Sequence, residues 1–241
     1  MEQILISQRA LTGWWEMSNK PIKAGDRKQQ EKLRMKMERK KKMEIPLLPP
    51  FIYIATEGAI TETAYLSNIV DCVNKRYGKF SRHDRIVLEG YGLSCLKLLE
   101  KAENKVERKY QNTDVVWLVY DKDDFPKDDF DNTQFSAAKK ESCKYKVAWS
   151  NECIELWFLL HFQDVNVNIG REEYLKRLEK YCAYCKTDKD LYSKLKDKTN
   201  DAIKRAQKLY DSYPPESAPS AMCPATRFHE LIIELQSYLE Y

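Results

Sequence analysis

The sequence predicts an α/β fold in which helices cover both faces of a doubly wound parallel sheet. Four short apolar runs, rich in β-branched and aromatic residues, alternate with segments of helical periodicity. The runs are continuously apolar, which indicates strands that are buried on both faces of a sheet. Strands that alternate with helices form right-handed βαβ units, and these build a doubly wound sheet.

The expected strands are residues 51–56, 85–89, 114–121 and 145–150. Apolar residues at helical spacing predict helices over 62–77, 93–110 and 133–142 between them, and over 152–162, 171–183, 189–210 and 227–239 after the fourth strand. Three prolines, Pro46, Pro49 and Pro50, come before the first strand, where they cannot continue a helix. We therefore expect an N-terminal arm with a proline joint over 1–50, an α/β core over 51–165, and a helical extension of the same domain over 166–241.

The charge is distributed unevenly along the chain. Residues 20–42 contain eleven Lys or Arg and three acidic residues, a net charge of +8. The whole chain carries +4, so the other 218 residues have a net charge of −4. Basic arms of this kind often bind phosphates, and such binding weakens as salt rises. A solvated helix or a disordered tail would have the same composition, so the arm alone does not establish nucleic-acid binding.

Composition limits the class of protein. The chain is 43% hydrophobic and 32% charged, which is too apolar for a disordered protein. Its longest apolar stretches are shorter than the roughly 20 residues that a membrane-spanning helix needs. The N-terminal residues lack the features of a signal peptide, so we expect a soluble cytoplasmic protein that does not contact a membrane. Seven irregularly spaced cysteines indicate reduced thiols, and whether Cys182 and Cys185 bind metal stays open because no second pair accompanies them.

Polar and acidic residues follow three of the predicted strands. Glu57 follows the first strand, Asp121 and Asp123 follow the third, and Ser150 follows the fourth. Because ligands of open α/β sheets bind at the carboxyl ends of the strands, these side chains should meet at one edge. In an extended segment Asp121 and Asp123 would point to the same side, and gathered carboxylates favour Mg²⁺ or Mn²⁺. Glu57 would complete the metal site or act as a general acid or base.

Several segments match motifs of a known family. Residues 56–58 with Thr61 and Glu62 match EGxxTE, and residues 119–125 match a DxDxF-like segment. Residues 150–151, 153, 155–157 and 160–162 match SNPCFELWLLLHF, and residues 224–226 match NPST. Over roughly residues 50–240 the chain thus resembles the Toprim domain and, more narrowly, the RloB-like proteins, a Toprim-related family of bacteria and archaea encoded with restriction and phage-defence genes. It departs from the family at Glu152, Ile154 and Cys223, where Pro, Phe and Asn are usual.

The resemblance implies a Toprim-type, Mg²⁺-dependent endonuclease in cytoplasmic antiviral defence by abortive infection. It implies catalytic and metal-binding roles for Glu57, Asp121 and Asp123. Lys122, Asn151 and Lys189 are expected to contact the substrate. Glu62, Ser150 and Glu155 are expected to support the site. RNA, and tRNA in particular, is favoured over DNA because a Toprim effector of a related defence system resembles this chain and cuts tRNA.

Simpler roles are open for several of these residues. Ser150 and Asn151 could cap the helix expected to begin near Glu152, and Glu62 could lie in solvent at a helix start. Glu155 lies among apolar residues and needs a cation, a Lys or Arg, or an exposed face. His161 and Trp157 are expected in the core.

Two other functions fit the same sequence. The chain could be a non-catalytic subunit that binds nucleic acid or acts as a scaffold, with the acids binding Mg²⁺ for structure only, or, less readily, a nucleotidyl transferase or primase. The sequence has no GxxxxGK[ST] loop, so an ATP-driven step would require a partner ATPase.

Removal of residues 1–43 tests the role of the arm. We expect lower affinity for nucleic acid and a shallower dependence of log K on log salt, because each lost phosphate contact reduces that slope by roughly 0.7 to 0.9. Filter binding at several salt concentrations measures both quantities. A truncated protein with an unchanged slope would show that the arm does not bind phosphates.

Overall fold

The computed structural model describes residues 28–29, 31–35 and 47–239. The chain divides into two units after Pro46. In the first unit residues 28–29 and 31–35 are helical and exposed, and the rest of the predicted basic arm lies outside the described residues. The second unit holds the sheet and all the predicted site residues.

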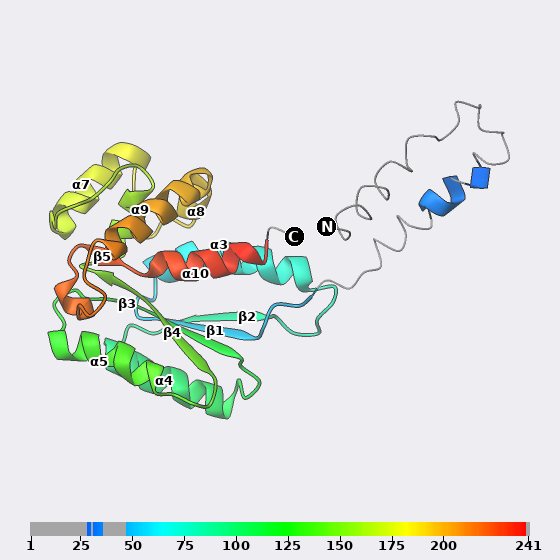
Figure 1. Ribbon diagram of the computed structural model, residues 1–241, viewed down its shortest axis with the longest axis horizontal. Helices are drawn as coiled ribbons and strands as arrows, with labels where there is room; N and C mark the ends of the chain where they lie inside the picture. Colours follow the sequence, from blue (N-terminus) through cyan, green and yellow to red (C-terminus); the bar gives the residue numbers. More distant parts are fainter. Residues whose placement is uncertain (1–27, 30, 36–46, 240–241) are drawn as a thin grey trace, which may run out of the picture. The chain divides into compact units, whose positions relative to one another are not determined.

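Five strands form one sheet in the order β2-β1-β3-β4-β5 (Figure 1). Their bounds are β1 (Ile52–Thr56), β2 (Ile86–Gly90), β3 (Val115–Asp121), β4 (Lys144–Asn151) and β5 (Ala225–Thr226). The first four strands are parallel to their neighbours, whereas β5 is antiparallel to β4. This arrangement confirms the predicted α/β class, and it brings the carboxyl ends of β1, β3 and β4 to one edge of the sheet.

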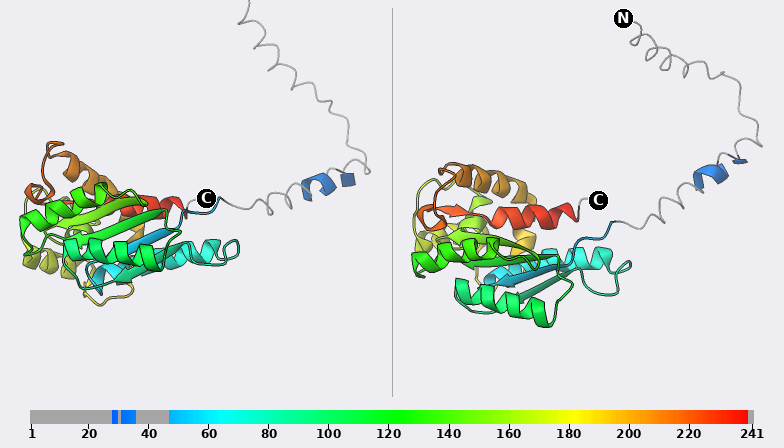
Figure 2. Two further views of the ribbon diagram at one scale, coloured as in Figure 1. Left: turned by 90° about the horizontal axis from the view of Figure 1, so that it is seen from below. Right: turned by 60° about the horizontal axis from the view of Figure 1, so that its bottom comes forward.

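The helices lie on both faces of this sheet. Their bounds are α3 (Thr61–Tyr77), α4 (Cys95–Arg108), α5 (Lys127–Ala138), α6 (Glu155–Leu160), α7 (Arg171–Cys182), α8 (Leu191–Leu195), α9 (Thr199–Asp211) and α10 (Phe228–Ser237). Helices α4 and α5 cover one face, and α3 and α10 cover the other (Figures 1 and 2). Helices α6 to α9 pack on the side of α3 and α10. Among the described residues, every helix is too short or too polar to span a bilayer.

Each face of the sheet has its own hydrophobic core. Ile54 and Trp117 point into the core under α3 and α10, whereas Tyr53, Val116 and Leu118 point into the core under α4 and α5. Successive residues of a strand alternate between faces, so a strand covered on both sides must be apolar at every position. This burial explains why the strands are continuous apolar runs in the sequence.

Three of the predicted helices differ from the observed ones by more than two residues at an end or are interrupted. Helix α5 begins at Lys127, six residues before the predicted start, because Pro126 and the acids of its first turn suit a helix N-terminus although they lack apolar periodicity. The helix predicted over 189–210 is broken by a 3₁₀ turn at Lys196–Lys198, since α8 packs on α3 whereas α9 packs on α6. The helix predicted from Glu152 starts only at Glu155, because β4 continues to Asn151.

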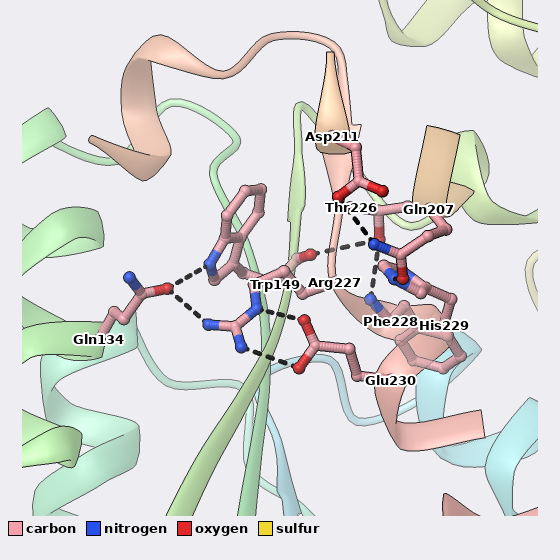
Figure 3. A network of polar contacts seen from close by, with 9 residues as sticks. All are labelled: Gln134, Trp149, Gln207, Asp211, Thr226, Arg227, Phe228, His229 and Glu230. Carbon is pink, nitrogen blue, oxygen red and sulfur yellow. Dashed lines mark hydrogen bonds and ion pairs between the residues drawn. The ribbon is translucent and has the colours of Figure 1, made fainter. Parts of the chain in front are cut away.

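The short strand β5 has no counterpart in the sequence prediction. The Arg227 N–H next to it donates to the Trp149 carbonyl oxygen at 2.8 Å. The Arg227 guanidinium makes two hydrogen bonds to Glu230, at 2.7 and 2.8 Å, and one to Gln134 Oε1 at 3.0 Å, which also accepts from Trp149 Nε1 at 2.8 Å (Figure 3). These contacts join α5, β4 and α10, so the strand depends on a tertiary network that two residues of sequence do not reveal.

Candidate active site

Glu57 directly follows β1, at the carboxyl edge of the sheet. Its N–H donates to the Val119 carbonyl oxygen at 2.8 Å, and its own carbonyl oxygen accepts from the Gly92 N–H at 2.7 Å. Its side-chain Oε2 accepts a hydrogen bond from the Asp121 N–H at 3.1 Å. Glu57 is thus fixed between the segment after β2 and the end of β3, and the structure brings it to Asp121 across 64 residues of sequence.

The turn from β1 into α3 places a second carboxylate beside Glu57. The hydroxyls of Thr56 and Thr63 both donate to the Gly58 carbonyl oxygen, at 2.8 and 2.9 Å. A Cβ atom on Gly58 would lie 1.9 Å from Glu62 Oε2, so only glycine leaves room for that carboxylate. Glu62 therefore lies against the turn and is almost completely buried, which excludes the predicted alternative of a solvated helix start.

Asp121 and Asp123 lie at the end of β3 in different surroundings. Asp121 is buried, and its Oδ2 accepts from the Ile154 N–H at 2.8 Å, at the start of α6. Asp123 has φ 37°, in the left-handed region, and its N–H donates to the Glu152 carbonyl oxygen at 3.0 Å. The predicted extended segment is therefore wrong, because the chain turns after β3. The turn directs the Asp123 carboxylate to an ion pair with Arg171.

Arg171, the first residue of α7, forms an ion pair with one of these acids. Besides its ion pair with Asp123, its Nε lies 4.0 Å from Glu155 Oε2. Glu155 is buried, and its Oε1 accepts from the Tyr184 hydroxyl at 3.1 Å. The partner that the sequence required for Glu155 is thus a tyrosine together with an arginine.

These side chains line one cleft of about 430 Å³ at the carboxyl edge of the sheet. Five carboxylates line it, those of Glu57, Glu62, Asp121, Asp123 and Glu155. The lining also includes two cationic residues, Arg171 and Lys186, and the segment from Gly92 to Ser94 before α4. Fully ionised, the side chains of the cleft would carry a net charge of −3.

Burial and mutual repulsion raise the pKa values of this cluster. Burial raises the pKa of Glu57 to about 8, the charges of Asp123 and Glu62 add to the shift, and the hydrogen bond from Asp121 opposes it. Burial raises the pKa of Asp121, and the charge of Glu62 raises it further. The pKa values of Glu62 and Asp123 are also raised by burial, although Arg171 opposes both shifts. The cleft therefore favours ligands that remove negative charge, namely protons or cations.

Four other predicted site residues do not line the cleft. The Lys122 ammonium hydrogen-bonds the carbonyl oxygens of Asp123 and Phe125. Asn151 is buried and donates to the carbonyl oxygens of Pro219 and Ser220. The two remaining residues are Ser150, which is buried and hydrogen-bonded to Thr226, and Lys189, which is exposed in the turn before α8.

Neither Ser150 nor Asn151 caps α6, because both belong to β4. The N–H at the start of that helix is satisfied by Asp121 instead. Trp157 and His161 are buried in the core as predicted, and His161 Nδ1 is hydrogen-bonded to the Trp157 carbonyl oxygen at 3.0 Å.

The carboxylates can supply oxygen ligands to a metal. In the described part of the chain, no group of three or more Asp, Glu, His or Cys side chains lies so that it could together hold a metal ion, Cys182 and Cys185 included. Glu57 and Asp121, however, each use one carboxylate oxygen for a hydrogen bond to the backbone, and the second receives none from the described residues. Mg²⁺ commonly keeps several waters and binds through one or two carboxylates. The donor set therefore fits a hydrated Mg²⁺ or Mn²⁺ at Glu57 and Asp121, with Asp123 beside them.

The fold and the cleft define an α/β protein with an acidic site at the carboxyl edge of a parallel sheet. A model of the family described as RloB-like protein matches residues 52–235. The chain therefore belongs to the RloB-like family. Comparisons with curated proteins and with solved structures found no match.

Sequence reasoning missed three polar residues around the cleft. Arg171 looked like an ordinary helix start, and Tyr184 and Lys186 lie in the segment after α7. No spacing or motif distinguishes them, since α6 and α7 bring them to the carboxylates only in the folded protein. The one available signal was the buried charge expected at Glu155, which required a partner from elsewhere in the chain.

The raised pKa of Glu57 predicts a pH-dependent stability in the presence of a chelator. Its pKa is about 8 in the folded protein and near 4.5 in the unfolded chain, so between these values only the folded protein binds the proton. The free energy of unfolding therefore falls as the pH rises from about 4.5 to about 8. Glu57→Gln keeps an oxygen for the Asp121 N–H and should be more stable than wild type at pH 8.5 by roughly 2–4 kcal/mol. This is less than the full pKa shift of Glu57 implies, because the carboxyl is partly exposed.

Urea unfolding at pH 5 and pH 8.5 measures this difference, which should nearly vanish at the lower pH. Asp128→Asn removes an exposed carboxylate of α5 and should show the wild-type pH dependence between these two pH values, since an exposed aspartate is ionised at both. Equal pH dependence in wild type and Glu57→Gln would contradict the charge repulsion inferred for the cleft.

Proposed function

We propose that this RloB-like protein is a metal-dependent endonuclease of prokaryotic antiviral defence. The observation that carries the proposal is the convergence of Glu57, Asp121 and Asp123 on one cleft at the ends of β1 and β3. Carboxylates collected at this edge of a parallel sheet are the ligands of metal-assisted phosphodiester cleavage. The family membership supports the same function through the Toprim-like motifs described above.

The residues of the cleft divide into two roles in this proposal, metal binding and phosphate binding. Asp121 and Glu57 would hold the metal through their free carboxylate oxygens, and Asp123 lies beside them. Mg²⁺ or Mn²⁺, when bound, supplies a Lewis acid for the phosphoryl oxygens. Arg171 and Lys186 offer donors to non-bridging oxygens of the substrate, Arg171 with a planar fork and Lys186 with a point charge.

Proton transfer is an alternative role for Glu57, because its one free carboxylate oxygen holds either the metal or a proton. Burial and neighbouring acids bring its pKa to about 8, close to the physiological range in which an efficient general acid or base operates. Its position next to Asp121 places that proton beside the metal ligand. In this alternative Asp121 holds the metal, and Glu57 gives its proton to the leaving oxygen.

RNA, and tRNA in particular, is the proposed substrate, and the cytoplasm the proposed location. The substrate rests on the family resemblance, because the cleft contains groups that bind phosphate oxygens and these are the same in RNA and DNA. The location rests on the irregularly spaced cysteines, which suit the reduced thiols of a cytoplasmic protein. The sequence contains no nucleotide-binding loop of the GxxxxGK[ST] type, so a partner ATPase is proposed for any ATP-driven control.

One observation favours the alternative of a non-catalytic nucleic-acid-binding subunit. Glu57, Asp121 and Asp123 are each already engaged by a backbone N–H or by Arg171, as structural carboxylates would be. In that case the acids stabilise the turn after β3 and the nucleic acid is bound without being cut.

A cleavage assay distinguishes the two functions. Purified wild-type protein is incubated with labelled tRNA, single-stranded DNA and duplex DNA in Mg²⁺, in Mn²⁺ and in EDTA. We expect metal-dependent cleavage that falls by about 100-fold or more in Glu57→Gln and Asp121→Asn, since each variant loses an acid-base or ligand carboxylate. Asp123→Asn should behave similarly, because Asn tolerates the left-handed backbone while losing the charge.

Asp128→Asn is the matched control, because it removes an exposed acid of the same region. It should cleave at the wild-type rate. Binding of the nucleic acid without cleavage by wild type and all variants would support the non-catalytic subunit, and cleavage that persists in Asp121→Asn would exclude this cleft as the active site.

A further inference from the structure

A stripe of lysines runs along α4. Lys97, Lys101 and Lys105 recur every four residues, so they lie on one side of the helix and are separated by about 6 Å along its axis. Lys109 follows at the same spacing, directly after the helix ends. Lys97, Lys101 and Lys109 are exposed, and Lys105 is half-buried. We call these four residues the lysine stripe.

The acidic residues of α4 do not neutralise this stripe. Glu100, Glu103 and Glu107 recur at three- and four-residue intervals on another side of the helix, and Glu103 forms an ion pair with Lys140 of α5 at 2.5 Å. Within the described residues, neither Lys97 nor Lys101 has an ion-pair partner. The side of α4 that carries the stripe is therefore positively charged.

Two tyrosine rings lie beneath the ammonium groups. Lys101 and Lys105 lie over the Tyr91 ring, with their Nζ atoms 5.6 and 5.9 Å from its centroid, and Lys109 Nζ lies 4.9 Å from the Tyr110 centroid. Such cation–π contacts restrict where the flexible lysine side chains can lie. The surface beside β2 thus combines ordered positive charge with aromatic rings.

One carboxylate anchors this arrangement. Glu89 of β2 accepts hydrogen bonds from the hydroxyls of Tyr53 at 2.9 Å, Tyr110 at 2.8 Å and Tyr91, and it forms an ion pair with Lys105 at 3.1 Å. Burial opposes ionisation of Glu89, but these hydrogen bonds together outweigh it and lower its pKa to about 2. Its single negative charge pairs with two lysines of the stripe, Lys105 and Lys109, the latter at 3.8 Å, so the surface keeps an excess of positive charge.

The lysine stripe begins at the edge of the acidic cleft. The Tyr91 N–H donates to the carbonyl oxygen of Thr56, the residue before Glu57, at 3.1 Å. The next three residues, through Ser94, line the cleft, and Lys97 lies one helical turn after Ser94. A ligand that occupies the cleft can therefore continue along α4 without leaving the protein surface.

We propose that the lysine stripe, with Tyr91 and Tyr110, binds the phosphate backbone of a single nucleic-acid strand and leads it to the cleft. This inference rests on the proposed function for the identity of the ligand. A cleft lined by five carboxylates repels a polyanion, so the strand must gain its affinity from cations outside the cleft. Lysines along the backbone with aromatic rings between them are the usual elements of single-strand binding.

Fluorescence anisotropy with full-length protein tests the proposal. Labelled single-stranded RNA, single-stranded DNA and duplex DNA of the same sequence are titrated in EDTA, where binding is measured without cleavage. The test variant is Lys97→Glu/Lys101→Glu on α4. The matched control is Lys204→Glu/Lys208→Glu, which makes the same charge change at the same spacing on exposed positions of α9.

The α4 variant should bind a single strand at least about tenfold more weakly than wild type, and its salt slope should be smaller by about 1.4, from two lost phosphate contacts. Lys97→Gln/Lys101→Gln should give an intermediate loss, and the α9 variant should bind as wild type. The RNA and DNA arms show which of the two backbones the stripe prefers.

Equal binding by wild type and both charge-reversal variants would overturn the proposal, and so would an equal loss in the α4 and α9 variants. The cleavage assay of the preceding section, in which Glu57→Gln is the inactive variant, separates this result from the nuclease proposal. If wild type never cleaves but only the α4 variant loses affinity, the lysine stripe is supported and the nuclease proposal fails. If wild type cleaves but the α4 variant binds normally, the nuclease proposal stands and the stripe is excluded.

Discussion

Repulsion between carboxylates at the ends of β1 and β3 is the constraint on which the rest of this structure depends. Burial and neighbouring charge raise the pKa values of Glu57, Glu62, Asp121 and Asp123, which means that each ionised form costs free energy in the fold. Proteins retain such an arrangement where function requires it, because a core without it would be more stable. The same negative charge that destabilises the fold is what a divalent cation would neutralise.

The surrounding elements hold the carboxylates in place by separate means. Central parallel strands bring Glu57 and Asp121 to adjacent positions, and backbone N–H groups fix one oxygen of each. Gly58 leaves space for Glu62, whereas Asp123 needs a left-handed backbone to reach Arg171. Single residues in sparsely populated conformations persist only where their surroundings enforce them, and they are frequent at functional sites. Positive charge is largely kept outside the cleft, along α4, where a polyanion would need it.

The sequence predicts the parts of this structure that follow from local pattern and topology. Apolar runs predict four strands, and the rule that parallel strands end at one edge predicts that Glu57 and Asp121 lie together. The sequence does not predict β5, which is held by Arg227. It also does not predict the turn that moves Asp123 out of an extended segment. Contacts between distant segments decide these features, so neither periodicity nor residue spacing records them. Asn151 shows the same limit, because its side chain turns away from the cleft to bind carbonyl oxygens near Ser220.

In the proposed function, the carboxylates of Glu57 and Asp121 bind one divalent cation. A titration of Mn²⁺ into chelator-treated protein, followed by the electron paramagnetic resonance signal of free Mn²⁺, tests this binding without reference to any substrate. Wild-type protein should remove the free-ion signal at one site, and Glu57→Gln and Asp121→Asn should each weaken binding at least about tenfold. An undiminished free-ion signal with wild type, or equal binding by wild type and both variants, would contradict it.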